Sequence, residues 1–418
     1  VEADGVGRRA EPVSTARAGA RRIQLLRGVM RTELPLVERM RPFVTTIFAE
    51  MSALAVRTGA INLGQGFPDT DGPASLLEDA VSAIRAGANQ YPPGPGVPEL
   101  RRAIAEHQKR FYDLDVDPDS DVLVTAGATE AIAATILALT EPGDEVVTFE
   151  PYYDSYAASI ALSGATRRTV VLRRPDFSFD RDEFAAAFTE RTRLVLLNSP
   201  HNPTGKVFTR DELDVIAGLA RAQDVLVVTD EVYEHLTFDG AQHVPMATLP
   251  GMAERTVTIS SAAKTFSVTG WKIGWLQAPA AITASIRAVK QFLTYVNGAP
   301  FQPAVARALG LDDDFFRTLA ADLQHKRDIL TDGLREAGFD VFPSTGTYFV
   351  IADAAPLGFD DGLELCWRLP ALAGVAAVPV STFHDDPHIA RSLIRFAFCK
   401  RNDVLAEAAV RLAKLNRL

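Results

Sequence analysis

The stretch SSAAKTFSVTGWKIGW, residues 260–275, decides how the rest of the chain is interpreted. Residues 256–259 before it are mostly β-branched and predict a buried strand that leads directly into it. Two serines precede Lys264, and a second lysine, Lys272, comes eight positions later. A lysine amine can form a Schiff base with an aldehyde, while hydroxyl and ammonium groups can hold a phosphate. The combination indicates pyridoxal 5'-phosphate (PLP), although the stretch alone is equally consistent with a turn that carries ordinary surface lysines.

The composition is typical of a globular enzyme and excludes several other classes. The 418 residues are enough for two domains, and 47% hydrophobic and 23% charged residues are ordinary proportions. A formal net charge of -10 argues against nucleic-acid binding, and no apolar run approaches the roughly 20 residues that span a bilayer. Cys366 and Cys399 are the only cysteines, which argues against a disulfide framework or a cysteine-rich zinc site. We therefore expect no metal and a cytoplasmic location.

Residues 1–34 differ from the rest of the chain. Seven arginines stand among alanine, glycine and valine, with little periodicity. Several acidic residues argue against an organelle-targeting signal, and no apolar core of the secretory kind is present. We expect a disordered extension, or sequence upstream of the native start, with Met30 as one candidate initiator.

The middle of the chain alternates between two kinds of pattern. The strand-like runs are 122–125, 145–149, 169–172, 194–198, 225–229 and 256–259. Helical runs separate most of them, which predicts an α/β domain with a mostly parallel sheet that helices cover on both faces. After about Phe315, a long amphipathic helix and three strand-like runs (348–352, 375–380 and 393–398) predict a smaller α+β domain. The expected division is an arm and the start of the small domain at 35–72, a large domain at 73–305, and a C-terminal small domain at 306–418.

Ligands in such sheets bind at the carboxyl ends of the strands, so the residues that follow the strands are the candidates. Asp230 comes after an apolar strand and could pair with a pyridine nitrogen, or it could simply cap a helix. Asn202 lies in a loop closed by two prolines, which alone would be an ordinary turn. Arg395 lies within an apolar strand and could bind a carboxylate or form a structural salt bridge.

Two further strand ends carry weaker signals. Residues 124–131 form a strand, a turn of small residues and the start of a helix, whose backbone N–H groups could cradle a phosphate. Many such turns bind nothing. Tyr152 and Tyr153 follow the strand at 145–149, where one ring could stack on a planar cofactor or belong to the core. Tyr91 lies in a Pro/Gly-rich loop and is expected to be presented on the surface.

Together and in this order, these motifs resemble those of the class I aminotransferases, PLP enzymes of fold type I. The resemblance runs from about residue 36 to the C-terminus and is carried by residues 260–275, SPHNPTG (199–205), TDEVYEH (229–235) and IRFAF (394–398). INLGQGFPD (61–69) and NQYPPGPG (89–96) are similar to the kynurenine/glutamine branch. With GAPFQPAVA (298–306), the chain most resembles the actinobacterial N-succinyldiaminopimelate branch.

The resemblance implies a role for each matching residue. Lys264 would form the Schiff base and move the substrate's α-proton. Asp230 would pair with the protonated ring nitrogen of the cofactor, and Tyr233 would hydrogen-bond its ring oxygen. The implied cofactor-binding residues are Ala128, Thr129, Tyr153, Asn202, Asp230, Tyr233, Ser261, Lys264, Lys272 and Tyr91. The implied substrate-binding residues are Gly66, Asn198 and Arg395, of which Arg395 would clamp the α-carboxylate. Tyr91 resembles a tyrosine that reaches the neighbouring subunit's phosphate, which implies a homodimer with shared active sites.

The resemblance also implies the reaction. It predicts ping-pong exchange of an amino group between an L-amino acid and a 2-oxo acid, with N-succinyl-LL-2,6-diaminopimelate and 2-oxoglutarate as the expected pair, in lysine and diaminopimelate biosynthesis. Small residues at Gly298 and Ala299 replace bulkier ones of kynurenine-type members, which predicts a roomier pocket. The alternative is a kynurenine/glutamine-type enzyme with cysteine-conjugate β-lyase activity. A PLP-sensing regulator is a remote alternative, because 34 residues are too few for a DNA-binding domain. A nicotinamide dehydrogenase is the remaining α/β alternative, and it is disfavoured because no strand is followed by a G-x-G-x-x-G motif that opens a helix.

Overall fold

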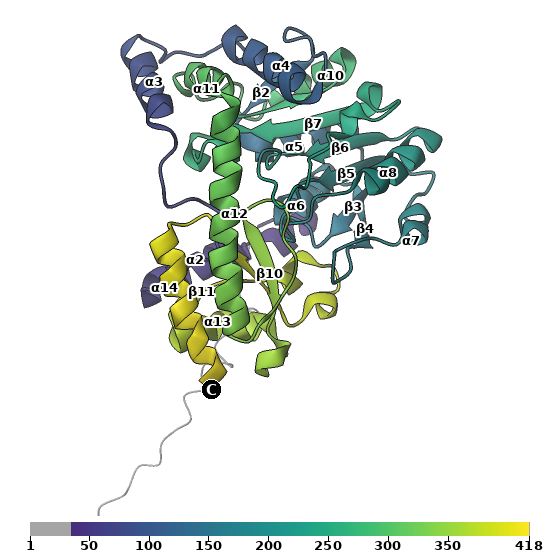
Figure 1. Cartoon of the computed structure of the whole chain (residues 1–418). Coiled ribbons are helices and arrows are strands. Elements are labelled where there is room, and N and C mark those ends of the chain that lie inside the picture. Colours follow the sequence, from purple (N-terminus) through teal and green to yellow (C-terminus); the bar gives the residue numbers. More distant parts are fainter. Residues whose placement is uncertain (1–34, 418) are drawn as a thin grey trace, which may run out of the picture. The chain divides into compact units, whose positions relative to one another are not determined.

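The predicted strands form one seven-stranded sheet in the order β2-β8-β7-β6-β5-β3-β4 (Figure 1). The computed structural model describes residues 35–417. The strands are β2 Val122–Thr125, β3 Glu145–Glu150, β4 Thr166–Val171, β5 Thr192–Asn198, β6 Leu226–Asp230, β7 Thr256–Ser261 and β8 Gly274–Gln277. Neighbours from β7 to β4 pair in parallel, and β8 pairs antiparallel with both β2 and β7. The predicted mostly parallel α/β sheet is confirmed.

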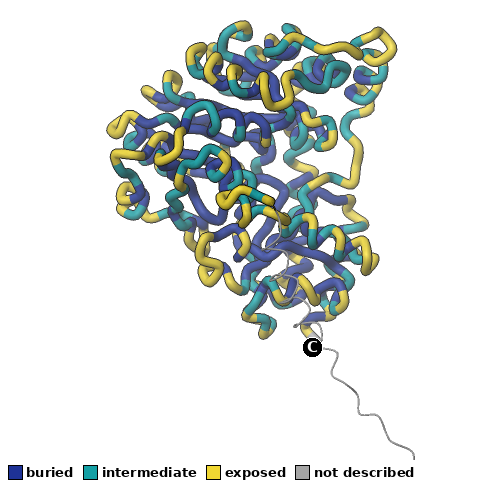
Figure 2. Tube along the Cα trace, turned by 180° about the vertical axis from the view of Figure 1, so that it is seen from behind, coloured by how far each residue is buried: buried dark blue, intermediate teal, exposed yellow. Residues whose placement is uncertain are grey.

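Helices surround the sheet, so its central strands are buried, whereas the edge strand β4 is partly exposed. Every residue of β2, β3, β7 and β8 is buried (Figure 2). The helices of this part are α3 Ala74–Arg85, α4 Pro98–Tyr112, α5 Gly127–Leu139, α6 Asp154–Ser163, α7 Arg181–Ala186, α8 Arg210–Ala222, α9 Ala262–Thr265, α10 Ala280–Lys290 and α11 Phe301–Leu309. Helix α8 begins with a capping box between Thr209 and Glu212 and packs Leu213 and Ile216 into the core beside β5 and β6.

Strand β8 was not among the predicted strands. Its sequence, GWLQ, follows a loop and contains no β-branched residue, so it shows no strand-like pattern. Its first residue must be a glycine, since a Cβ on Gly274 would lie 2.5 Å from the carbonyl carbon of Gly127 and 2.7 Å from the nitrogen of Ala128. This close approach places β8 directly against the start of α5.

A second, antiparallel sheet follows in the order β12-β13-β10-β9. Its strands are β9 Asp340–Val341, β10 Phe349–Asp353, β12 Val378–Pro379 and β13 Leu393–Ala397, and the surrounding helices are α2 Ile47–Thr58, α12 Asp313–Glu336, α13 Gly362–Ala373 and α14 Asn402–Leu412. The prediction of one strand over 375–380 is wrong. Residues Val375–Ala376 form β11, which pairs in parallel with β1 (Ile61–Asn62), whereas β12 pairs with β13.

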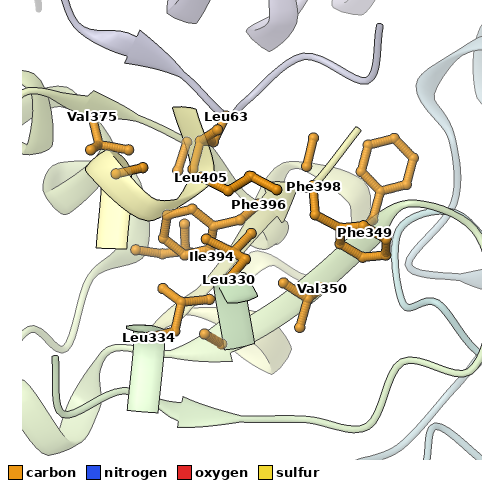
Figure 3. Packing of buried hydrophobic residues seen from close by; sticks show 14 of the residues in the cluster. Leu63, Leu330, Leu334, Phe349, Val350, Val375, Ile394, Phe396, Phe398 and Leu405 are labelled. Atoms are coloured by element: carbon orange, nitrogen blue, oxygen red, sulfur yellow. The ribbon is translucent and has the colours of Figure 1, made fainter. Parts of the chain in front are cut away.

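Helix α12 extends from the large sheet to the small one, as Figure 1 shows, and packs in a hydrophobic cluster beside each. Near its start, Phe316 packs in the cluster that contains Phe266. Near its end, Leu330 and Leu334 pack in the cluster around the small sheet, together with Val350 and Phe396 (Figure 3). The same helix therefore contributes to the cores beside both sheets.

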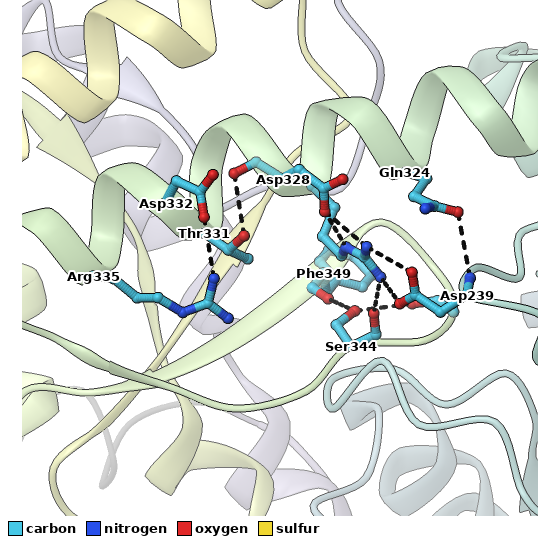
Figure 4. Close-up of polar contacts among 10 residues, drawn as sticks. Asp239, Gln324, Asp328, Thr331, Asp332, Arg335, Ser344 and Phe349 are labelled. Carbon is cyan, nitrogen blue, oxygen red and sulfur yellow. Dashed lines mark hydrogen bonds and ion pairs between the residues drawn. The ribbon is translucent and has the colours of Figure 1, made fainter.

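Polar contacts also connect α12 to the loop before β10. Arg327 on α12 donates 2.9 Å to the backbone oxygen of Ser344 and pairs with Asp239. The Ser344 hydroxyl donates 2.7 Å to the backbone oxygen of Phe349 (Figure 4). These contacts fix the start of β10, where Phe349 lies beside Arg395.

Residues 45–417 group into one compact unit, and the described residues before it, 35–44, contain the short 3-10 helix Glu38–Phe43. The predicted extension 1–34, with Met30, lies outside the described residues. The predicted boundaries at residues 73 and 306 remain predictions. Among the helices of residues 35–417, none combines the length and the apolar character needed to cross a membrane.

Candidate active site

Most of the predicted site residues meet at the carboxyl edge of β5, β6 and β7. Asn198 ends β5 and is in register with Asp230, the last residue of β6. The Asn198 amide donates 2.7 Å to the backbone oxygen of Asp230, and its oxygen accepts from the Asn202 N–H at 2.7 Å. Lys264 lies on the short helix α9 directly after β7. Parallel pairing therefore brings together residues that are far apart in the sequence.

Asp230 is a buried carboxylate with one hydroxyl donor. Tyr156 on α6 donates to Oδ2 at 2.6 Å, and the Val232 N–H approaches Oδ1 at 3.4 Å. Desolvation raises the pKa of Asp230 to about 6, although the Tyr156 hydrogen bond and the Lys264 charge lower it. A turn rather than a helix follows Asp230, so it does not cap a helix. A buried acid of this kind is suited to a cationic hydrogen-bond donor.

Lys264 is half-buried between two tyrosine rings. Its Nζ lies 5.7 Å from the ring centroid of Tyr233 and 5.6 Å from that of Tyr348. Desolvation lowers the pKa of Lys264 to about 8, while the nearby Cys399 and Asp230 act in the opposite direction. The amine therefore has a much larger neutral, nucleophilic fraction near pH 7 than a solvated lysine.

A cradle for an anion forms where α5 begins. Gly127 has a φ of 75°, and the position of a Cβ there would lie 3.1 Å from Nζ of Lys272. Ala128 and Thr129 occupy the first turn of α5, whose N–H groups and dipole favour negative charge. Ser261 is buried and in register with Gly274 across β7 and β8. The predicted phosphate residues Ala128, Thr129, Ser261 and Lys272 thus surround one location.

Asn297 connects the two sides of this cradle, the end of β2 and the loop before β8. The sequence did not indicate this role. Its Nδ2 donates 3.1 Å to the backbone oxygen of Thr125 and 3.0 Å to that of Lys272. Gln302 donates 2.6 Å to the Asn297 backbone oxygen and accepts from Val97 at 2.8 Å. These bonds connect the cradle to the segment that follows Tyr91.

Arg395 is 1% exposed, in the middle of β13. Its Nη1 donates 2.8 Å to the Asn202 side-chain oxygen, and its Nη2 donates 2.7 Å to the Gly64 backbone oxygen. The guanidinium lies 4.0 Å from the Phe349 ring centroid, and desolvation lowers its pKa to about 10.

No carboxylate pairs with Arg395 within residues 35–417, so the structural salt bridge is excluded there. Its Nε is buried and has no hydrogen-bond partner in the same part of the chain. A buried cation with neutral acceptors and a spare donor is suited to a carboxylate ligand. Gly66 lies nearby, where its backbone oxygen accepts from Tyr348 at 2.6 Å.

The structure does not bring every predicted residue to this location. Tyr91 is 81% exposed, and its ring packs edge-on against Tyr295 at 5.6 Å. Its surface presentation is confirmed. Tyr153, by contrast, lies at the site: it is at the N-terminus of α6, with its ring 5.7 Å from that of Tyr156, which donates to Asp230.

Three residues of the site were missed from the sequence. Tyr156 is three residues after Tyr153, so helical spacing in EPYYDSY was an available signal. Tyr348 and Asn297 gave no such signal, because long-range packing determines their positions.

Comparison with known proteins agrees with this geometry. The family model for aminotransferase class I and II matches residues 58–412. The chain belongs to this family. It is therefore an aminotransferase, and like other class I members it uses PLP.

Several relatives match over nearly their whole length. A probable N-succinyldiaminopimelate aminotransferase DapC of Mycobacterium tuberculosis is 55% identical, over 91% of this chain and 98% of that protein. A methionine aminotransferase of Escherichia coli is 44% identical, over 92% and 100%. A kynurenine–oxoglutarate transaminase of Dictyostelium discoideum is 36% identical, over 90% and 95%. The solved structure of an N-succinyldiaminopimelate aminotransferase from M. tuberculosis has a TM-score of 0.89 and 56% identity, over 91% of this chain and 100% of that one.

The residues on this edge of the sheet fit PLP. The cradle at the start of α5 would take the phosphate, and a Cβ on Gly127 would crowd Lys272 there. The buried acid of Asp230 would take the ring nitrogen, and the amine of Lys264 would take the aldehyde. Bound PLP supplies an electron-withdrawing ring that stabilises negative charge at the substrate's α-carbon.

We expect Tyr156→Phe to weaken cofactor binding. Removing the 2.6 Å donor destabilises the ionised form of Asp230, so its pKa rises further and its hold on a cationic ring nitrogen falls. A hydrogen bond to a charged group is worth about 1.5–3 kcal/mol, which corresponds to roughly tenfold to a hundredfold in affinity. Equilibrium dialysis with cofactor absorbance measures this loss. Tyr112→Phe is the matched control, since it removes a hydroxyl that donates 2.9 Å to Glu234 instead; equal losses in both variants would contradict the role of Tyr156.

The lowered pKa of Lys264 predicts a pH profile. In the cofactor-free protein, reductive methylation of Lys264 should rise as pH increases through about 8, because only the neutral amine reacts. A free N-acetyl-lysine amide should respond about two pH units higher, near the ordinary value of about 10.4. Peptide mass spectrometry after short labelling gives both curves. Coinciding curves would show that burial does not tune this amine.

Proposed function

We propose that the chain transfers the amino group of N-succinyl-LL-2,6-diaminopimelate to and from 2-oxoglutarate, in lysine and diaminopimelate biosynthesis. The single observation that supports this choice of substrate is the 55% identity to the probable N-succinyldiaminopimelate aminotransferase, which extends over nearly the full length of both proteins. The methionine and kynurenine enzymes match at lower identity over similar lengths. Kynurenine/glutamine-type activity remains the alternative, and methionine becomes a further substrate to test. A cytoplasmic location remains a prediction.

In this proposal, Arg395 holds the α-carboxylate of either substrate. The spare Nε supplies a donor, while the bonds to Asn202 and Gly64 hold the guanidinium in place. Lys264 acts as the base that removes the α-proton and returns it, which its lowered pKa favours. With PLP bound, Asp230 would stay ionised and pair with the ring nitrogen, while Tyr233 and Asn202 would donate to the ring oxygen. Tyr153 would stack on the ring, and Asn198 and Gly66 would line the carboxylate site.

The expectation of a roomier pocket at Gly298 stays a prediction, because the backbone gives a second reason for glycine there. Gly298 has a φ of 55°, and a Cβ would lie 2.3 Å from Cδ1 of Ile273. The left-handed backbone therefore favours glycine at this position regardless of the substrate. Gly298→Phe would distort the turn and is not a usable test. Ala299, which has an ordinary backbone, remains available to test pocket size.

A half-reaction assay tests the substrate. The purified holoenzyme is mixed in turn with N-succinyl-LL-diaminopimelate, glutamate, kynurenine, glutamine and methionine, and the loss of the aldehyde form of the cofactor is followed by absorbance. We expect fast conversion by the succinylated diamino acid and glutamate, and slow conversion by kynurenine. Faster conversion by kynurenine, glutamine or methionine would overturn the proposed substrate. Lys264→Ala is the matched control, and it should lower the rate at least about a hundredfold with every amino acid.

We also infer a homodimer in which Tyr91 of each subunit completes the phosphate site of the other. Tyr91 is exposed and its ring contacts Tyr295, and two further apolar side chains of the same segment, Phe292 and Leu293, are also exposed. Exposed aromatic groups of this kind are typical of protein interfaces.

Complementation tests the shared site. Tyr91→Ala and Lys264→Ala chains should each have low activity alone. In a mixed dimer, one site combines the intact Lys264 with the partner chain's intact tyrosine, so co-expression should restore a measurable part of the wild-type activity. If each chain builds its own site, the mixture should be no more active than the sum of the two variants. Sedimentation of the wild-type protein as a monomer would also contradict the inference.

A further inference from the structure

Two histidines and a glutamate that are remote in the sequence meet outside the cofactor site. His107 is on α4, and Glu234 and His235 are in the turn after β6, immediately beyond Tyr233. The Nε2 atoms of the two histidines face each other at 2.7 Å, across 128 residues of chain. One ligating atom from each of the three residues lies within 4.8 Å of the others. His107 and Glu234 are 3% and 6% exposed, and His235 is half-buried.

The protonation pattern leaves these nitrogens available as ligands. Desolvation lowers the pKa of His107, and it lowers that of His235 to about 3, so both rings are neutral at pH 7. Neutral imidazole is the form that binds metal ions. Two neutral rings joined through their Nε2 atoms share one proton. A metal ion between the rings would take the place of that shared proton.

The surroundings hold the three side chains in this arrangement. The ring of Phe111 lies 4.7 Å from each of the two histidine rings, and that of Phe316 lies 4.3 Å from His235. Glu234 is oriented by two hydroxyl donors, Ser260 at 2.6 Å and Tyr112 at 2.9 Å. Hydrogen bonds of this kind around a carboxylate ligand are a regular feature of metal sites.

We propose that His107, Glu234 and His235 form a site for one divalent transition-metal ion of the Zn²⁺ type. Two imidazoles and one carboxylate are a ligand set that zinc accepts, with water as a fourth ligand on the half-exposed side of His235. Bond lengths of about 2.0–2.1 Å in a tetrahedron separate two nitrogens by roughly 3.3 Å. The histidines therefore have to move apart by about 0.6 Å from their 2.7 Å contact.

Metal binding also moves one proton. Gln108 approaches Nδ1 of His107 through its amide nitrogen at 3.5 Å and accepts from Gln277 at 2.7 Å, which places the His107 proton on Nε2. Once the metal holds Nε2, this proton moves to Nδ1, and the Gln108 amide turns its oxygen towards it. The histidine pair then releases no proton. The ion would join α4 to the turn that carries Asp230 and Tyr233, so occupancy should stabilise the fold around the cofactor site.

Calorimetric titration of the chelator-treated, untagged holoenzyme with Zn²⁺ tests the site. We expect one ion per chain, and binding at least about tenfold weaker in His107→Gln and Glu234→Gln, because each removes one ligand. His388→Gln is the matched control, since it removes an exposed histidine elsewhere and should leave the affinity unchanged. Absence of a stoichiometric ion, or equal affinity in all three variants, would overturn the site.

A second measurement avoids dependence on the variants. Co²⁺ bound to the unaltered holoenzyme should give the strong visible d–d bands of a tetrahedral site, with no change in cofactor absorbance. Zn²⁺ should displace these bands and should raise the thermal unfolding temperature. Weak bands typical of octahedral aqueous Co²⁺ would overturn the proposal. So would bands that appear only together with a change in the cofactor spectrum, since they would place the ion at the cofactor.

Discussion

The buried carboxylate of Asp230 is the constraint on which the active site depends. It lies at the buried end of β6, in the middle of the large sheet, where an uncompensated charge is costly. One tyrosine hydroxyl and a distant lysine offset that cost only partly, as the raised pKa indicates. Without the cofactor, the negative charge of Asp230 is therefore incompletely compensated, and a cationic ring nitrogen would compensate it.

The large sheet and the edge that carries the site could be predicted from the sequence, because continuous apolar strands alternate with helices. Asp230 and Lys264 were identified for the same reason, since each follows a predicted strand, whereas Asn198 was identified through the resemblance to the family. Prediction failed where structure depends on contacts between distant segments. Strand β8 has no β-branched residue to indicate it, and the single strand expected at 375–380 divides because its two ends pair with different partners.

The same limit applies to the supporting residues of the site. Asn297 holds two backbone carbonyls, Thr125 and Lys272, which come together only when β2 and β8 pair. Tyr348 reaches the Gly66 backbone across 282 residues. His107 and His235 show no metal-binding spacing, because α4 and the turn after β6 meet only in the folded chain. Residue type indicates chemistry, but only the fold shows which groups support it.

The way Arg395 is held has a consequence for how this family diversifies. Its partners are one backbone oxygen and one amide oxygen, both neutral and both supplied by segments that also build the sheet edge. If Arg395 binds the α-carboxylate as proposed, it recognises a group that every amino acid and every 2-oxo acid shares, and it does not distinguish the rest of the molecule. Selectivity would then depend on residues farther from the reacting atoms. Relatives with different named substrates would differ in those residues rather than in the arginine.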